Sequence, residues 1–158
     1  MTEHHPARSA GPAAGPEALI GADAEPAGEI KGIGIDLTLI RRHRQMVERW
    51  GDRYLRRVFT DAEIAYCRRR RDPAPHLAAR FAAKEAALKA LGTGLRMGVS
   101  WRELEVRRER GGAPSMVLSG RSAAIARARG ARRVLVTLTH EGDYAMAQVV
   151  LLGNARGA

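Results

Sequence analysis

The sequence predicts a chain that combines helices with β-strands, and three stretches carry that prediction. Residues 80–91 consist mostly of strong helix formers, and Gly92-Thr93-Gly94 ends them with residues that tolerate positive φ. Residues 30–37 alternate apolar side chains with glycine, which is typical of a strand that another backbone approaches closely. Residues 134–152 form two β-rich runs around a Glu-Gly-Asp segment, which predicts a hairpin.

The remaining elements follow from local signals. Thr60-Asp61-Ala62-Glu63 is a capping box, so we expect a helix from there to about Arg70. The other expected elements are a helix from Leu39 to about Trp50 that breaks near Gly51-Asp52, a loop at Asp72–Pro75, strands at Trp101–Val106 and Pro114–Leu118 joined through Gly111-Gly112, and a helix at Ser119–Arg129 that ends at Gly130.

A chain of 158 residues suits one domain with a modest core, which we place at residues 30–153. Residues 1–29 contain four of the seven prolines and no apolar periodicity, so we expect a disordered tail there, with a short C-terminal tail at 154–158. The sequence has no apolar run long enough to span a membrane and no signal-peptide pattern. The single cysteine, Cys67, fits a reducing compartment, so we predict a cytoplasmic protein.

Charge is distributed unevenly along the chain. The formal net charge is +10; residues 1–30 contain five acids and one arginine, a net of −4, so the remaining 128 residues carry +14. So basic a domain attracts polyanions such as nucleic acid, anionic lipid, a phosphate-rich cofactor or an acidic protein. Charge alone does not choose among these partners.

The helix at 80–91 places one acid among several cations. At 3.6 residues per turn, Phe81, Glu85 and Lys89 share one side of the helix. Arg80 and Lys84 fall on the adjoining side, which makes an anion-receiving surface with one candidate metal ligand. For Glu85 alone, the ordinary interpretation is a surface helix with Glu–Lys pairs at i,i+4.

Asp36 is the second acid that could complete a metal site. It lies at or near the end of the strand at 30–37, where the alternative role is an N-cap for the next helix. Asp36 and Glu85 together suit Mg²⁺, which takes one or two protein carboxylates and completes its shell with water and phosphates. Zinc would need closely spaced His and Cys, which the sequence lacks. With a diphosphate as the third party, metal-assisted phosphoryl transfer follows.

The run Arg80-Phe81-Ala82-Ala83-Lys84-Glu85-Ala86-Ala87-Leu88-Lys89-Ala90-Leu91-Gly92-Thr93-Gly94 resembles the signature helix of the phosphopantetheinyl transferases, of the holo-acyl-carrier-protein synthase type. The similarity extends from about Gly32 to Leu152 and includes Gly32-Ile33-Gly34-Ile35-Asp36 and Thr139-His140, in the family's order. The resemblance implies an α+β fold in which a mostly antiparallel sheet packs with a long central helix. It also implies a homotrimer with active sites between neighbouring subunits.

The resemblance implies an activity as well: transfer of 4′-phosphopantetheine from coenzyme A to a serine of apo-acyl carrier protein, with release of adenosine 3′,5′-bisphosphate, in fatty acid biosynthesis. Asp36 and Glu85 match the metal ligands, and Lys89 matches the lysine that stabilises or protonates the leaving phosphate. The serine proton goes to a metal-bound water or to an adjacent carboxylate. The residues that resemble coenzyme A contacts are Arg80, Lys84, Lys89, Gly92, Thr93, Gly94 and His140.

Arg42, Arg53 and Arg57 resemble family positions that face the acidic carrier, although exposed arginines are common in so basic a chain. Two positions depart from the family pattern. Leu39 stands where a glutamate is usual, and Ala113 stands where the family has the lysine of a Gly-Lys-Pro element. Neither departure removes a metal ligand, but choice of carrier could differ.

Two alternative functions fit parts of the sequence. The same transfer could serve a polyketide or peptide synthetase carrier domain. A basic nucleic-acid-binding module would explain the charge, but aromatic residues make up only 4% of the chain and no nucleic-acid-binding motif is present.

Overall fold

The computed structural model describes residues 28–108 and 113–154. In chain order, the elements are β1 (Ile30–Leu39), α1 (Ile40–Val58), α2 (Asp61–Arg68), α3 (Pro73–Leu91), the short 3₁₀ helix η1 (Trp101–Glu103), β2 (Leu104–Arg108), β3 (Pro114–Leu118), α4 (Gly120–Ala128), β4 (Arg133–Glu141) and β5 (Tyr144–Leu152). Most of the predicted N-terminal tail, the Gly111-Gly112 connection and residues 155–158 lie outside the described residues, so the predicted domain boundaries stay predictions.

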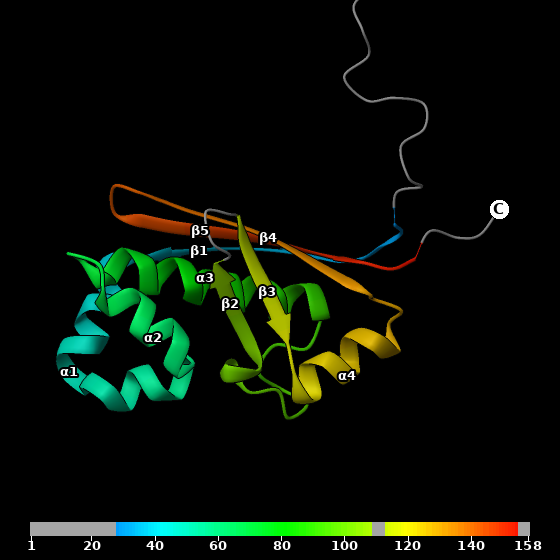
Figure 1. The fold of residues 1–158 in the computed structure, drawn as a ribbon, viewed down its shortest axis with the longest axis horizontal. Coiled ribbons are helices and arrows are strands. Elements are labelled where there is room, and N and C mark those ends of the chain that lie inside the picture. Colours follow the sequence, from blue (N-terminus) through cyan, green and yellow to red (C-terminus); the bar gives the residue numbers. More distant parts are fainter. Residues whose placement is uncertain (1–27, 109–112, 155–158) are drawn as a thin grey trace, which may run out of the picture.

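An antiparallel sheet extends along one side of the molecule. Among the described residues its strand order is β1-β5-β4, and β2 pairs with β3 in a second antiparallel ladder. Figure 1 shows α3 lying along the first sheet, with α1 and α2 at one end of the molecule and α4 at the other. The predicted α+β class, with its antiparallel sheet and long helix, is confirmed.

Two glycines in β1 decide how closely α3 approaches the sheet. A β-carbon at Gly34 would lie 2.0 Å from the carbonyl oxygen of Ala86, and one at Gly32 would lie 2.2 Å from that of Ala90. Both distances are far below van der Waals contact, so no larger residue fits at either position. The backbone of α3 therefore lies directly against β1, as the glycine pattern predicted.

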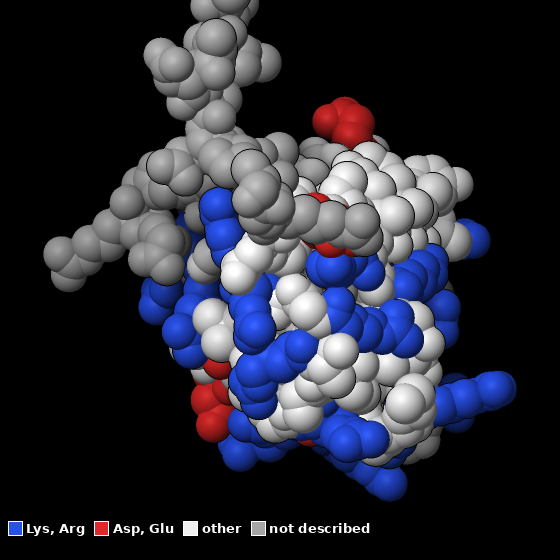
Figure 2. Space-filling view, turned by 90° about the vertical axis from the view of Figure 1, so that its right-hand side faces the viewer, with Lys and Arg blue, Asp and Glu red and all other residues white. Residues whose placement is uncertain are grey.

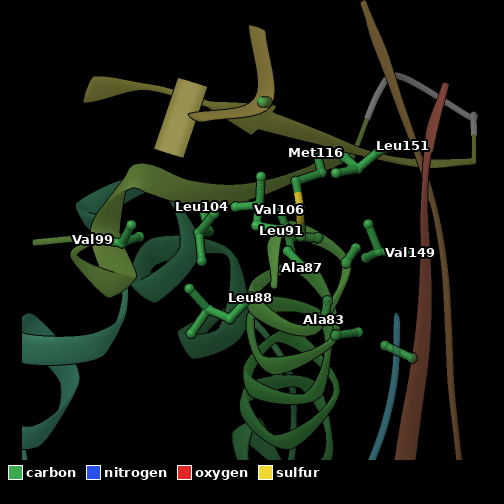
Figure 3. Close-up of a cluster of buried hydrophobic side chains, with 14 of the residues drawn as sticks. Ala83, Ala87, Leu88, Leu91, Val99, Leu104, Val106, Met116, Val149 and Leu151 are labelled. Atoms are coloured by element: carbon green, nitrogen blue, oxygen red, sulfur yellow. The ribbon is translucent and has the colours of Figure 1, made fainter. Parts of the chain in front are cut away.

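The buried side of α3 is built largely from alanines. Ala82, Ala83, Ala86 and Ala87 are fully buried, and their small side chains let the sheet and the β2–β3 ladder both reach the helix. The larger side chains packed around them are Leu88, Leu91, Leu104, Val106, Met116, Val149 and Leu151 (Figure 3). This core fixes the position of α3, the element on which the candidate site depends.

The break predicted in the first helix is present. Gly51 has φ 47° and ψ −130°, which are not helical values, and α1 continues beyond it to Val58, further than expected. The capping box is also confirmed: the Glu63 N–H donates to Thr60 Oγ1, and the Thr60 N–H donates to Glu63 Oε2. The helix it begins, α2, ends at Arg68, two residues before the expected end.

Two local predictions were wrong. Pro73 and Pro75 belong to the first turn of α3 rather than to a loop. Backbone N–H groups in the first turn of a helix have no partner within the helix, so proline, which lacks an N–H, is tolerated there. Asp72 caps the turn by accepting a hydrogen bond from the Ala74 N–H. Residues 101–103 form η1, so β2 begins only at Leu104. The C-terminal hairpin and α4 formed as predicted. No helix within the described ranges is long and apolar enough to cross a membrane.

Candidate active site

Asp36 and Lys89 meet where β1 lies against α3. The Nζ of Lys89 lies 2.9 Å from Asp36 Oδ1 and donates a second hydrogen bond, also of 2.9 Å, to the carbonyl oxygen of Ile35. The Lys89 side chain is 53% exposed, so the pair lies at the surface. Asp36 is inside β1, opposite Ala147 of β5, and the N-cap of α1 is Leu39, so the alternative role of Asp36 as a helix cap was wrong.

Glu85 adds a second carboxylate to this site. Burial and the nearby charge of Asp36 raise the pKa of Glu85, while Lys89 and Arg42 lower it. The two carboxylates are therefore close enough to repel each other. A divalent cation held by oxygens of both carboxylates would remove that repulsion. No group of three His, Cys, Asp or Glu side chains gathers in the described part of the chain. Two carboxylates that leave positions for water and phosphates fit Mg²⁺.

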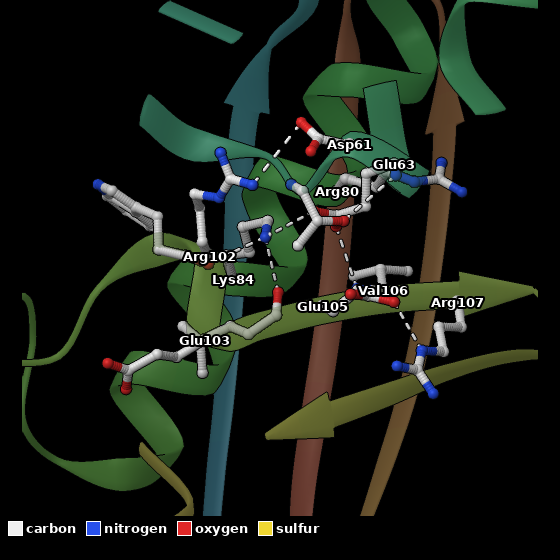
Figure 4. A network of polar contacts seen from close by, with 12 residues as sticks. Asp61, Glu63, Arg80, Lys84, Arg102, Glu103, Glu105, Val106 and Arg107 are labelled. Carbon is white, nitrogen blue, oxygen red and sulfur yellow. Dashed lines mark hydrogen bonds and ion pairs between the residues drawn. The ribbon is translucent and has the colours of Figure 1, made fainter. Parts of the chain in front are cut away.

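Lys84 precedes Glu85 in the sequence but points away from this site. Its side chain is fully buried, and its Nζ lies 2.9 Å from Glu63 Oε2 (Figure 4). The ammonium also donates to the carbonyl oxygens of Trp101 (3.0 Å) and Leu104 (2.7 Å). Burial lowers the pKa of Lys84, and the ion pair opposes that shift. All the donors of Lys84 are thus engaged within the chain, and the structure does not support its predicted contact with coenzyme A.

Glu63 is a polar residue whose full role the sequence did not reveal. One carboxylate oxygen pairs with Lys84 and accepts the capping hydrogen bond of Thr60, and the other accepts the backbone N–H of Val106 at 3.0 Å. A single buried carboxylate thereby joins α2, α3 and β2 (Figure 4). The capping box identified the first role of Glu63, but no spacing rule links it to a lysine in the next helix.

A cavity of about 390 Å³ forms a second part of the candidate site. Its lining includes Tyr66, His76, Arg80, Arg108, Ala113 and His140. The rings of His76 and His140 meet edge to face, with centroids 5.3 Å apart. The Arg80 guanidinium lies 4.0 Å from the centre of the Tyr66 ring, and its Nε has no hydrogen-bond partner among the described residues although the residue is only 4% exposed. A buried, unpaired cationic donor beside a cavity suits an anionic ligand.

Tyr66, which lines this cavity, is hydrogen-bonded to two arginines. Its hydroxyl accepts hydrogen bonds from Arg70 (2.7 Å) and Arg108 (3.1 Å). Burial raises the pKa of Tyr66, but these hydrogen bonds and the charges of the two arginines together outweigh that effect and lower it. The sequence reasoning missed both Tyr66 and His76. His76 lies four residues before Arg80 on one helix, so i,i+4 spacing could have found it, whereas nothing in the sequence signals Tyr66.

The predicted coenzyme A contacts do not all meet within one chain. Gly92 ends α3 in the left-handed conformation (φ 63°), and its N–H donates to the carbonyl oxygens of Leu88 and Lys89. At 1.5 Å per residue, this turn lies about 18 Å along the helix axis from Arg80. Asp36 and His140 are also separated, because β5 lies between β1 and β4.

The three arginines predicted to face a carrier are exposed on α1. Arg53 and Arg57 lie beyond the break at Gly51 and line a hollow of about 330 Å³. The Arg53 guanidinium lies 5.7 Å from the ring centre of Trp50 in the same hollow. Arg42 lies before the break, and its charge lowers the pKa of Glu85, so this arginine lies near that carboxylate.

Positive charge is not confined to α1. Figure 2 shows Lys and Arg side chains across the end of the molecule that carries α4. Exposed basic residues of that region include Arg121, Arg127, Arg129, Arg132 and Arg133. Charge alone therefore does not identify a docking surface. The position of Arg42 near the carboxylates is the better indication.

The comparisons with known proteins agree with this fold. The solved structures of holo-[acyl-carrier-protein] synthases from Neisseria meningitidis (TM-score 0.71, 32% identity) and Bacillus anthracis (TM-score 0.65, 32% identity) are similar over 98% of their own chains and over 78% and 79% of this one. The fold therefore indicates one class of enzyme, the phosphopantetheinyl transferases. Residues 32–149 match the 4′-phosphopantetheinyl transferase superfamily, and the chain belongs to that superfamily.

The curated relatives are more specific. Holo-[acyl-carrier-protein] synthase from Koribacter versatilis is 48% identical over 122 residues, which cover 77% of this chain and 98% of the relative. The protein of that name from Anaeromyxobacter dehalogenans is 50% identical over 127 residues, covering 78% and 97%. The predicted resemblance to the holo-acyl-carrier-protein synthase type is confirmed.

Proposed function

We propose that this chain transfers the 4′-phosphopantetheine group of coenzyme A to a serine hydroxyl of an apo-acyl carrier protein in the cytoplasm, for fatty acid synthesis. The observation that carries the proposal is the meeting of Asp36, Glu85 and Lys89 at the β1–α3 contact, in a chain whose relatives are holo-[acyl-carrier-protein] synthases. In the reaction, the serine oxygen bonds to the phosphorus that bears the pantetheine arm. The bond from that phosphorus to the bridging diphosphate oxygen breaks, and adenosine 3′,5′-bisphosphate leaves.

Asp36 and Glu85 would hold Mg²⁺, which when bound neutralises charge on the diphosphate oxygens. Lys89 lies at the same surface with its ammonium on Asp36, so it can move to a phosphate oxygen of the departing nucleotide and stabilise its charge. A nearby carboxylate or a water molecule would accept the serine proton.

The cavity around Arg80 and His140 would receive the nucleotide end of coenzyme A. Its unpaired guanidinium nitrogen and surrounding arginines suit phosphate, and the Helicobacter pylori relative was solved in complex with coenzyme A. Ala113, where the family has a lysine, lines this cavity, so a cationic phosphate contact of relatives would be absent here. Thr93 and the two glycines of its turn would contact the ligand from a neighbouring subunit.

A homotrimer with shared active sites would bring these separated groups together. Ile33, Ile35 and Leu37 of β1 are 59%, 54% and 60% exposed on the face of the sheet turned away from α3, and Met146 continues this apolar surface on β5. A second copy that covered this face would bury apolar area and could also complete each cavity.

The test is to incubate the protein with coenzyme A, Mg²⁺ and purified apo-carriers and to follow carrier mass. We expect the mass gain of one phosphopantetheine group on a fatty acid synthesis carrier, and loss of activity without Mg²⁺. Faster modification of a polyketide or peptide synthetase carrier would move the proposal to that carrier class. No mass gain on any carrier would contradict it. Sedimentation of the same sample reports whether the protein is a trimer.

A further inference from the structure

His43 lies at the centre of a buried polar chain that joins β1 to α1. The residue is 2% exposed; its Nε2 lies 3.0 Å from the hydroxyl oxygen of Thr38, and its Nδ1 lies 2.7 Å from that of Tyr54. Thr38 and Tyr54 are buried as well. A neutral imidazole donates through one ring nitrogen and accepts through the other, so His43 can satisfy both hydroxyls at once.

The same ring contacts both elements that carry the candidate metal ligands. Phe81 of α3 packs against His43 with ring centroids 4.7 Å apart, and Phe81 lies one helical turn before Glu85. Thr38 lies two residues after Asp36, and therefore on the same side of β1. His43 is thus connected to the strand of one carboxylate and to the helix of the other.

The hydrogen bond from His43 to Tyr54 spans the break in α1. Gly51 lies between the two residues and has non-helical φ and ψ, so regular helical geometry does not set the angle between residues 40–50 and 52–58. Arg53 and Arg57 lie on the second half, beside Tyr54. Core packing of Leu55 and Val58 also holds that half, and the hydrogen bond between Tyr54 and His43 ties it to the first half.

We propose that His43 and Tyr54 are positioning residues for the carrier: their hydrogen bond sets the angle between the two halves of α1 and so holds Arg53 and Arg57 in register with Asp36 and Glu85. A carrier that binds the arginines then presents its serine to the carboxylates. This inference rests on the proposed transfer to a carrier protein.

Both residues are uncharged near neutral pH, so the contact is maintained under assay conditions. Burial, with the charge of Arg42, lowers the pKa of His43 to about 4. Burial also raises the pKa of the Tyr54 hydroxyl.

The first test is kinetic and uses Tyr54→Phe, which keeps the ring and removes the hydroxyl. We expect KM for the apo-carrier to rise about fivefold, while kcat and KM for coenzyme A each change by less than about twofold. A His43→Phe, Tyr54→Phe double variant should raise the carrier KM no more than the larger single effect, because both substitutions remove one contact.

A matched control separates positioning from simple stability. Ser122→Ala removes a buried hydroxyl from α4, at the far end of the molecule, where it donates to the carbonyl oxygens of Ser119 and Glu103. We expect this control to leave both KM values unchanged. The proposal is overturned if Tyr54→Phe changes kcat and both KM values by the same factor, or leaves the carrier KM unchanged.

A second test needs no carrier. Gln45→Cys and Arg56→Cys place spin labels on exposed positions of the two halves of α1, and the native Cys67 is buried with a pKa raised to about 11, so it labels poorly. We expect pulsed EPR to show a broader label-to-label distance distribution when Tyr54→Phe is added. An unchanged distribution overturns the positioning proposal alone, whereas failure of the wild-type chain to modify any carrier overturns the proposed function and the carrier-positioning role with it.

Discussion

Two lysines on α3 form ion pairs of opposite kinds. Lys84 is fully buried, pairs with Glu63 and has acceptors for all its donors. Lys89 is about half exposed and pairs with Asp36 beside a second carboxylate. Five residues turn a helix by about 140°, so the two side chains leave it in different directions. The buried lysine–carboxylate pair joins elements of the fold, whereas the exposed pair remains accessible to a ligand.

Loss of the open carboxylate should have the largest effect on activity. We expect Asp36→Asn to lower the rate of transfer by about a thousandfold or more, because a proposed metal ligand is lost while the fold remains. Carrier mass in a timed assay measures this, with thermal unfolding to verify the fold. Asp61→Asn, at an exposed acid of α2, is the control and should retain full activity. Full activity in Asp36→Asn would contradict the assignment.

Loss of the enclosed lysine should act on stability instead. We expect Lys84→Met to lower the free energy of unfolding by about 3–5 kcal/mol, because Glu63 would remain buried without its counter-charge. Lys89→Met should change it by less than about 1 kcal/mol. Urea unfolding measures both, and adding Glu63→Gln to Lys84→Met should recover part of the loss. Equal losses for the two lysines would remove the distinction.

The contact between β1 and α3 can be tested with one methyl group. Gly34→Ala would place a β-carbon 2.0 Å from the Ala86 carbonyl oxygen, so the helix must shift. We expect a loss of about 1–3 kcal/mol in stability. We also expect a loss of transfer activity larger than unfolding explains, because Asp36 and Glu85 would separate. Activity measured on the folded fraction decides; an unaffected rate would show that the close approach does not matter.

The smallest expected effect concerns the charge of Glu85. Its raised pKa means that the folded chain disfavours the ionised form, so ionisation reduces stability above the native pKa and has no effect well below the ordinary value of 4.5. Glu85→Gln should therefore be more stable than the wild type at pH 7 without metal. The difference should disappear as the pH falls below about 4. A less stable Glu85→Gln at pH 7 would contradict the proposed repulsion.

The residues of the open pair were predicted to lie at one site, although not their ion pair, whereas the enclosed pair was not predicted. The glycines of β1 signalled a close backbone approach, and helical spacing put Glu85 and Lys89 on one side of the helix. The buried side of α3 was not evident from the sequence, because the alanines of this helix are spread around its circumference and give little contrast between an apolar and a polar side. Lys84 was therefore expected to contact coenzyme A, although its ion-pair partner, Glu63, lies on another helix.

The contacts across α1 show the same limit. Gly51 signalled a break, but nothing in the sequence relates His43 to Tyr54 once the helix no longer fixes their spacing. Tyr66 likewise meets Arg80 and Arg108 only after α2, α3 and β2 have packed. Local signals predicted the elements, and tertiary packing determined which polar groups meet.

The central claim is that Asp36 and Glu85 hold one divalent ion together. The most direct measurement is titration of Mn²⁺ as a spectroscopic substitute for Mg²⁺, followed by EPR, with coenzyme A present. We predict about one bound ion per chain in the wild type and a loss of at least tenfold in affinity in both Asp36→Asn and Glu85→Gln. Wild-type affinity in either variant would contradict the account.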